Sequence, residues 1–391
     1  MLRLLHTADV HLGARHADLG DQAAAQRERQ LAAFVATIEL AIAERVDVVL
    51  IAGDLFDSNT QPRRTVERVA AELRRLADAR IRTVIIPGTH DVYDRASIYR
   101  VHDLKAMAGS SADDDLVTVL TPERGEVHLS ACDVIVHGPV FATKRAPHSP
   151  LRDLSVRGGD GATWHVGMVH GALAIPGRTD GDEVVITRDE IAATGLDYLA
   201  LGHWHSTQDG KAGGTTYAYA GAPEPVAVSQ DGAGKVLLVR LDETNGSRSV
   251  GLEERAVGRT RFDRLDIDAA EIDDEPALVK RIVALADPDL VLEVRLTGVR
   301  PDALDVAADD VEEQARGGFL KVRVRDQSVP ALTEGMLPSA DTIPGAFIRN
   351  VEARIAELEA DPSPSSLEDA AELRDVLRLG RLLLAGHEVS L

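Results

Sequence analysis

Aspartate and histidine residues gather in five short motifs that follow one another in a fixed order along the chain. The motifs are Asp9-Val-His11, Gly53-Asp54, Gly88-Thr89-His90-Asp91, Val169-His170-Gly171 and Gly202-His203-Trp204-His205. Most of them come directly after a short apolar run that is typical of a buried strand. Carboxylate oxygens and imidazole nitrogens together suit Mn²⁺, Fe²⁺ or Zn²⁺. Two such ions that share a bridging carboxylate form a centre that cleaves phosphoesters.

Each motif alone also has a plain structural explanation. Asp9 and His11 are two residues apart, so in extended backbone both side chains project to one side, although a surface loop explains the pair equally well. His203 and His205 share that spacing and follow an apolar run. Gly202 gives the backbone the freedom to turn at this point, so this pair favours a metal site.

The remaining acidic and histidine residues are interpreted in the same way. An ionised Asp54 at the end of an apolar run needs partners, and either a metal bridge or a helix cap would supply them. A lone histidine such as His90 or His170 is more often structural than metal-binding. Because independent structural explanations are improbable for every motif in this order, the sequence predicts one shared metal site.

Strands and helices alternate through the first third of the chain. Apolar runs predict strands at residues 2–7, 46–52 and 81–86, and helical periodicity predicts helices at 23–45 and 62–79. This alternation favours a sheet with parallel pairs and right-handed crossovers. Sites in such sheets collect beyond the carboxyl ends of the strands. Asp9, Asp54 and His90 all lie at those ends.

Short β-type runs dominate the segment from residue 116 to residue 241. They lie at residues 117–120, 127–129, 134–136, 164–169, 198–201, 215–220 and 236–241. We expect them to form a second sheet that packs on the first, with helices outside, so the fold class is α/β (α+β) in an αββα sandwich.

The character of the chain changes near residue 259. A β-α-β-α-β order predicts a small separate α/β domain, and the tail is helical again. The expected domains are therefore 1–258, 259–330 and 331–391. The last comprises a linker and a C-terminal helical segment.

Composition narrows the class of protein. The net charge of −21 argues against a broadly basic surface for nucleic acid. Cys132 is the only cysteine, so an intramolecular disulfide is excluded. The segment Gly232-Ala-Gly-Lys235 lacks the spacing of a P-loop, and no nucleotide cofactor is expected. Neither a signal peptide nor a membrane span is readable, which predicts a cytoplasmic protein without a membrane segment.

The motif order resembles the calcineurin-like metallophosphoesterase superfamily, whose motifs are D-x-H, G-D, G-N-H-D/E, H and G-H-x-H. Within it, the stretches HTADVHLG, AGDLFD and GHWH resemble SbcD-type exonucleases that repair DNA double-strand breaks. The resemblance covers residues 1 to about 250 and implies a metallophosphoesterase sandwich. The later segments fit the capping and ATPase-binding parts of such nucleases in order and size, without a motif of their own.

The resemblance also implies a role for each motif residue. One metal would be held by Asp9, His11, Asp54 and His205. Asp54 would bridge to a second metal held by His170 and His203, and Thr89 occupies the position of the family asparagine. The two divalent ions are expected to be Mn²⁺. His90 would contact the scissile phosphate and protonate the leaving oxygen, with Asp91 or Asp57 orienting it. A hydroxide activated by both metals would attack in line.

Thr89 is the one departure from the family pattern among these motifs. Its hydroxyl is shorter and a poorer ligand than an asparagine carbonyl. Water filling the gap, a weak second site and an inactive protein are the three consequences that stay open.

Three functions compete. The leading one is a metal-dependent nuclease that acts on DNA ends together with an SMC-like coiled-coil ATPase. The first alternative is a phosphoesterase for small substrates such as cyclic nucleotides, which would not need the domains after residue 259. The second is a catalytically weakened DNA-end or scaffold subunit, which Thr89 favours.

The predicted C-terminal helix at residues 365–387 is relevant to whether the protein binds an ATPase partner. Its apolar face comprises Leu373, Val376, Leu377, Leu379 and Leu383. Packing against the protein's own domains and docking onto the ATPase explain this face equally well. A homodimer is also considered because such nucleases often dimerise, although no self-complementary apolar stripe is readable.

Overall fold

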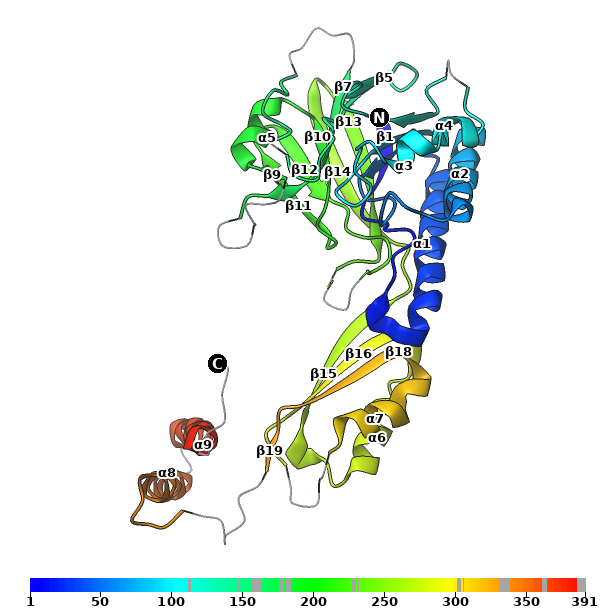
Figure 1. Ribbon diagram of the computed structural model, residues 1–391. Coiled ribbons are helices and arrows are strands. Elements are labelled where there is room, and N and C mark those ends of the chain that lie inside the picture. Colours follow the sequence, from blue (N-terminus) through cyan, green and yellow to red (C-terminus); the bar gives the residue numbers. More distant parts are fainter. Residues whose placement is uncertain are drawn as a thin grey trace. The chain divides into compact units, whose positions relative to one another are not determined.

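The computed structural model describes most of the 391 residues (Figure 1). The residues outside the description are 112–113, 147, 157–162, 176–178, 180–183, 227–229, 231, 301–303, 305, 331–337, 361–363 and 385–391. The chain forms two compact units. The first comprises Met1–Asp263 with Pro288–Val291, and the second comprises Arg264–Asp287 with Leu292–Leu391.

The first sheet of the first unit has the strand order β14-β13-β1-β2-β3-β4. Its strands are β1 (Leu2–Thr7), β2 (Val48–Ala52), β3 (Arg82–Ile86), β4 (Val117–Val119), β13 (Lys235–Thr244) and β14 (Ser247–Ala256). β1 to β4 are parallel, and β13 pairs with β1 in the antiparallel direction. The crossovers contain α1 (Ala23–Glu44) and α2 (Arg63–Asp78). The strands and helices predicted for the first third are confirmed to within two residues at each end.

The second sheet has the order β11-β12-β10-β7-β6-β5. Its strands are β5 (Glu126–Leu129), β6 (Val134–His137), β7 (Trp164–His170), β10 (Tyr198–Gly202), β11 (Gln208–Ala212) and β12 (Thr215–Tyr219). The prediction that residues 117–120 and 236–241 join this sheet is wrong, because β4 pairs with β3 and β13 pairs with β1. An apolar run indicates that a strand is buried, but both sheets bury their strands and the run does not identify its partner.

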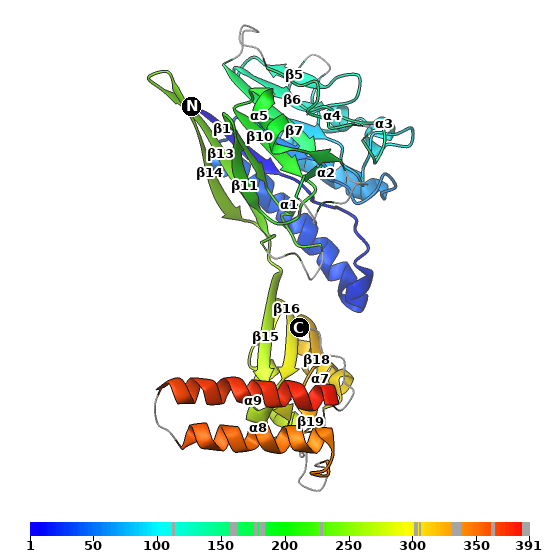
Figure 2. The same ribbon diagram turned by 90° about the vertical axis from the view of Figure 1, so that its left-hand side faces the viewer.

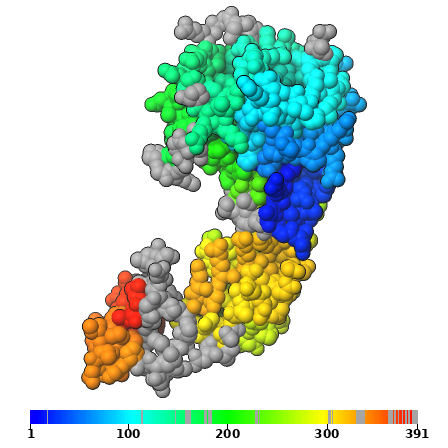
Figure 3. Space-filling model, viewed as in Figure 1, coloured from blue at the N-terminus to red at the C-terminus, as the bar shows by residue number. Residues whose placement is uncertain are grey.

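Three apolar layers hold the first unit together. Phe34 of α1 and Val69 of α2 are fully buried against the outer face of the first sheet. Leu50 of β2 and Met168 of β7 meet between the two sheets. On the far side of the second sheet, Ile191 of α5 (Arg188–Thr194) packs on the strands. The predicted αββα sandwich is confirmed. Figure 3 shows that the early (blue to cyan) and later (green) segments of the chain both reach the surface of this unit.

The second unit contains a three-stranded sheet of order β15-β16-β18. Its elements are β15 (Arg261–Asp268), α6 (Glu275–Val283), β16 (Asp287–Thr297), α7 (Ala308–Ala315) and β18 (Phe319–Asp326). This sequence of elements matches the predicted β-α-β-α-β order. The division predicted at residue 330 lies inside this unit, and the assignment of three domains stays a prediction.

The tail forms two helices, α8 (Ile343–Glu359) and α9 (Pro364–Leu384), which lie side by side (Figure 2). Thr342 caps α8, because its side-chain oxygen accepts a hydrogen bond from the Gly345 amide at 3.2 Å. Within the described part of the chain, no helix is long and apolar enough to cross a lipid bilayer.

Candidate metal centre

The carboxyl ends of β1, β2, β7 and β10 deliver the predicted site residues to one place. β1 and β2 are parallel, and backbone hydrogen bonds continue beyond their ends. The Asp9 amide donates to the Gly53 oxygen at 3.1 Å, and the His11 amide donates to the Asp54 oxygen at 2.9 Å. β7 and β10 are also parallel and end at His170 and Gly202. These pairings bring the motif residues of both sheets together.

The backbone at the site is left-handed at four non-glycine residues. The φ angles are 54° at Asp9, 49° at His11, 52° at Asp54 and 103° at His203. The expectation that Asp9 and His11 project from extended backbone is therefore wrong, because the chain turns sharply while it hydrogen-bonds to the loop after β2. Such conformations cost about 1–3 kcal/mol each and concentrate at functional sites.

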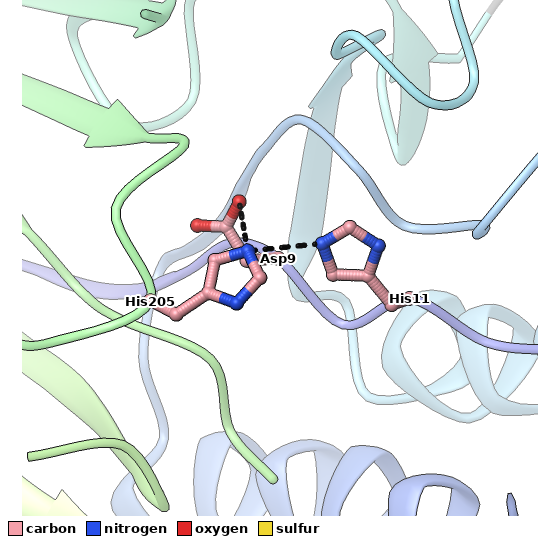
Figure 4. Close-up of side chains that lie close together, drawn as sticks. All are labelled: Asp9, His11 and His205. Carbon is pink, nitrogen blue, oxygen red and sulfur yellow. Dashed lines mark hydrogen bonds and ion pairs between the residues drawn. The ribbon is translucent and has the colours of Figure 1, made fainter. Parts of the chain in front are cut away.

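The first cluster comprises Asp9, His11 and His205, whose ligand atoms lie within 4.8 Å of one another. Figure 4 shows the two imidazoles approaching each other beside the Asp9 carboxylate. Nε2 of His11 lies 3.2 Å from Nε2 of His205, and the latter lies 3.9 Å from Asp9 Oδ1. Both carboxylate oxygens of the fully buried Asp9 accept from the His203 amide at 3.0 Å. Two facing imidazole nitrogens need a proton or a cation between them, so this donor set fits a metal ion.

The second cluster comprises Asp9, Asp54 and His170. Nδ1 of His170 donates to the Ala52 carbonyl oxygen at 2.9 Å. The opposite nitrogen, Nε2, therefore carries a lone pair in the neutral ring, and it lies 3.1 Å from Asp54 Oδ2. Two acceptor atoms at this distance also fit a cation. His203 lies next to this cluster, with its ring centroid 5.5 Å from that of His170.

The charges of the second cluster shift its protonation strongly. Burial alone would lower the pKa of His170, but the charge of Asp54 and the hydrogen bond to it raise the pKa to about 10. Burial alone would raise the pKa of Asp54, yet His170 and His11 hold it well below its usual range. Without a metal the cluster therefore takes up a proton, and a bound divalent ion would replace that proton.

The pKa values of the two facing histidines of the first cluster are shifted in opposite directions. Burial lowers the pKa of His11, but Asp57, Asp54 and Asp9 outweigh it and raise the pKa above the usual value. Burial lowers the pKa of His205, and the neighbouring His11 lowers it further. One ring is therefore protonated more readily than the other, as a shared proton between the two nitrogens requires.

His90 lies at the open side of the site, with 48% of its side chain exposed. Its Nδ1 donates to the Asp57 backbone oxygen at 3.0 Å and lies 3.7 Å from the Asp57 carboxylate. The same carboxylate lies 3.4 Å from Nδ1 of His11. Of the two residues expected to orient His90, Asp57 contacts the ring directly.

Asp91, the other residue expected to orient His90, makes its contacts with other groups. It is fully buried and accepts hydrogen bonds from the Gly88 amide at 2.7 Å, the Phe56 amide at 3.1 Å and the Tyr99 hydroxyl at 2.5 Å. Asp91 thus ties together the two turns that carry Asp54 and His90. Its geometry supports holding these turns in place rather than contact with a substrate.

Thr89 reaches the centre through its hydroxyl, which donates to Asp54 Oδ2 at 3.3 Å. The amide of the next residue, His90, donates to Asp54 Oδ1 at 2.7 Å. Both oxygens of the expected bridging carboxylate therefore already receive a donor from this turn.

Sequence reasoning missed several residues that shape the centre. Tyr99 carries no motif, and the Gln230 side chain contacts Nδ1 of His205 from a distant segment. Gly53 was part of a predicted motif, and the structure adds the reason for it: at φ 91° a Cβ there would lie 2.2 Å from the His170 ring.

Residues 2–207 match the model of the calcineurin-like phosphoesterase family, more than half of the chain. The chain belongs to this family. The resemblance inferred from the five motifs is therefore confirmed, and the residues of both clusters lie within the matched segment.

Comparison with individual proteins shows which members of the family the chain is similar to. A DNA double-strand break repair protein Mre11 from Aeropyrum pernix is 29% identical over 280 residues, which cover 69% of this chain and 64% of that protein. The Mre11 of Halobacterium salinarum is 25% identical over 84% of this chain and 78% of its own length. One of the subunits of the nuclease SbcCD from Rhodobacter capsulatus is 27% identical over 59% of this chain and 64% of its own length. The chain spans less than two thirds of the Aeropyrum and Rhodobacter proteins.

Proposed function

We propose that this phosphoesterase is a metal-dependent nuclease that cleaves phosphodiester bonds at DNA ends. Two pairs of facing acceptor atoms carry the proposal: Nε2 of His11 lies 3.2 Å from Nε2 of His205, and Nε2 of His170 lies 3.1 Å from Asp54 Oδ2. These contacts support two neighbouring cation sites. Similarity to Mre11 and to a nuclease subunit supports DNA as the substrate.

The residues divide between two ions that share Asp54. Asp9, His11, Asp54 and His205 would hold the first ion, and Asp54, His170 and His203 would hold the second, with Thr89 or water completing it. When bound, the ions would supply positive charge that activates water and neutralises the reacting phosphate. Mixed oxygen and nitrogen donors suit Mn²⁺, which we propose as the ion.

His90 is placed to act on the leaving group. Because its Nδ1 donates to the Asp57 carbonyl, Nε2 is the nitrogen left for the substrate. The Asp57 carboxylate at 3.7 Å would balance a positive charge on the ring while Nε2 protonates the leaving oxygen.

Nuclease activity is tested with linear duplex DNA and Mn²⁺. Wild-type protein should release nucleotides from the linear duplex and leave a closed circle of the same sequence intact. His11→Gln should lower the rate by about 100-fold or more, the scale on which one electrostatic partner of a reaction counts. His128→Gln is the matched control because His128 is exposed on β5. Equal rates for His11→Gln and the control would refute the proposal.

The hydrogen bond from Thr89 leaves two alternative functions that experiments must distinguish. Its hydroxyl donates to Asp54, which supports a second ion bound less tightly than the first. A protein that turns over a chromogenic phosphodiester but not DNA would be a small-substrate phosphoesterase. A protein that binds DNA ends without turning over either substrate would be a weakened scaffold subunit.

We also propose that α8 and α9 bind an SMC-like coiled-coil ATPase. Val376, Leu383 and Leu384 of α9 are exposed apolar residues, which supports a helical partner. Leu383→Glu should abolish co-purification with that ATPase, and unchanged co-purification would contradict the assignment. A homodimer and a cytoplasmic location stay predictions.

A further inference from the structure

A cavity of about 390 Å³ opens directly beside the metal centre. Its lining includes His203, Trp204 and His205 of the last motif and three polar residues, Ser206, Gln208 and Gln230. The candidate ligand His205 and its neighbour His203 therefore form part of both the centre and the cavity. A group that enters this cavity lies next to whatever the metal centre binds.

Trp204 is the large aromatic residue among those that line this cavity, and Tyr219 holds its indole in place. Its ring stacks on Tyr219 with 4.6 Å between centroids and 24° between planes. Tyr219 is itself fixed, because its hydroxyl donates to the Gly171 oxygen at 2.9 Å and accepts from the Leu173 amide at 2.8 Å. Since Tyr219 is almost completely buried, Trp204 rests on a rigid support.

Packing alone explains only part of this arrangement. Trp204 is a partly buried member of the apolar cluster around Leu199 and Leu201. Tyr219 covers one part of the indole, while another part lines the cavity together with Gln208 and Gln230. A rigid aromatic surface that faces a polar-rimmed cavity is suited to a flat, partly polar ligand.

We propose that Trp204 is a stacking platform for a nucleobase adjacent to the phosphodiester at the metal centre. The proposal rests on the proposed function and specifies it further. The preferred substrates are diesters in which a nucleoside flanks the scissile phosphate. Stacking accepts every base because each has a π face, and the exposed side-chain amide of Gln208 can hydrogen-bond to a base edge.

The kinetic test compares two esters that share one leaving group, thymidine 5′-phosphate p-nitrophenyl ester and methyl p-nitrophenyl phosphate. The ratio of their kcat/KM values measures the contribution of the nucleoside. Trp204→Leu should lower this ratio by about tenfold, the scale of one lost base stack, mainly through KM. Trp204→Phe should restore most of it. Trp164→Phe, which changes the other tryptophan of the chain, should leave the ratio unchanged. An unchanged ratio in Trp204→Leu overturns the proposal.

A binding measurement separates this proposal from the nuclease assignment. Deoxyadenosine 5′-monophosphate should quench tryptophan fluorescence of the wild-type protein and of Trp164→Phe, but not that of Trp204→Phe. Deoxyribose 5-phosphate should quench none of them. If neither the esters nor linear duplex DNA is hydrolysed, the proposed function fails, and quenching that requires Trp204 still supports the platform. Equal quenching in wild type and Trp204→Phe overturns it.

Discussion

Replacing Tyr99 by phenylalanine removes a single hydroxyl beside the candidate metal centre. That hydroxyl donates to Asp91 Oδ2 at 2.5 Å, and both residues are buried. The ring itself packs near Phe56, with 6.1 Å between the centroids, and would stay in place. The change therefore isolates one hydrogen bond to a carboxylate that joins two turns of the site.

The magnitude follows from the remaining partners of Asp91. The carboxylate keeps two donors, the amides of Gly88 and Phe56. Burial and the charge of Asp54 already raise its pKa, so the ionised form is poorly stabilised. A hydrogen bond to a charged group contributes about 1.5–3 kcal/mol. We expect Tyr99→Phe to lower the free energy of unfolding by about 2 kcal/mol and to reduce phosphodiesterase turnover, since the turn that carries His90 loosens.

The assay is urea unfolding of Tyr99→Phe beside Tyr93→Phe. Tyr93 is a matched control because the same atom is removed from a residue whose ring is stacked under Arg100, 4.1 Å from its guanidinium carbon. Equal free energies of unfolding for the two variants would refute the role assigned to Asp91 and Tyr99.

Three further outcomes follow from the same structure. Burial lowers the pKa of His6 to about 3, so the unfolded chain takes up a proton that the folded protein excludes, and stability falls as pH drops from about 6.5 towards 3. His6→Leu should remove about 2 kcal/mol of the loss between pH 7.5 and 5 in urea unfolding, and an unchanged loss would contradict the shift assigned to His6. Gly53→Ala should cost about 2–4 kcal/mol of unfolding free energy by thermal or urea denaturation, because its Cβ would lie 2.2 Å from the His170 ring at positive φ. Thr89→Asn should tighten the second metal site by about tenfold in a calorimetric Mn²⁺ titration, and unchanged binding would show that Thr89 does not limit it.

Sequence alone predicts the strands that are apolar throughout and the edge at which they end. β1, β2 and β10 read clearly because almost every residue in them is buried. β14 (Ser247–Ala256) and β11 (Gln208–Ala212) do not, since their mostly polar residues lie largely exposed at sheet edges and depend on pairing with β13 and β12. Pairing partners are long-range information that periodicity does not contain.

The candidate site also has features that the sequence predicts and features that it does not. Parallel strands end at one edge, and this explains why Asp9 and Asp54 converge as the motifs predict. The left-handed backbone at these residues is not predictable, because the hydrogen bonds between two loops impose it against residue preference. Gln230 was missed because its contact with His205 joins residues 25 positions apart. Tyr99 was missed because it belongs to no motif, although it lies only eight positions after Asp91.

The proposed function depends on divalent ions bound between the facing nitrogen and oxygen atoms at the sheet edges. Anomalous scattering at the manganese edge, from crystals grown with Mn²⁺, tests it most directly. One peak is expected among Asp9, His11 and His205, and a second, weaker peak between Asp54 and His170. Folded protein with no peak at either position would contradict it.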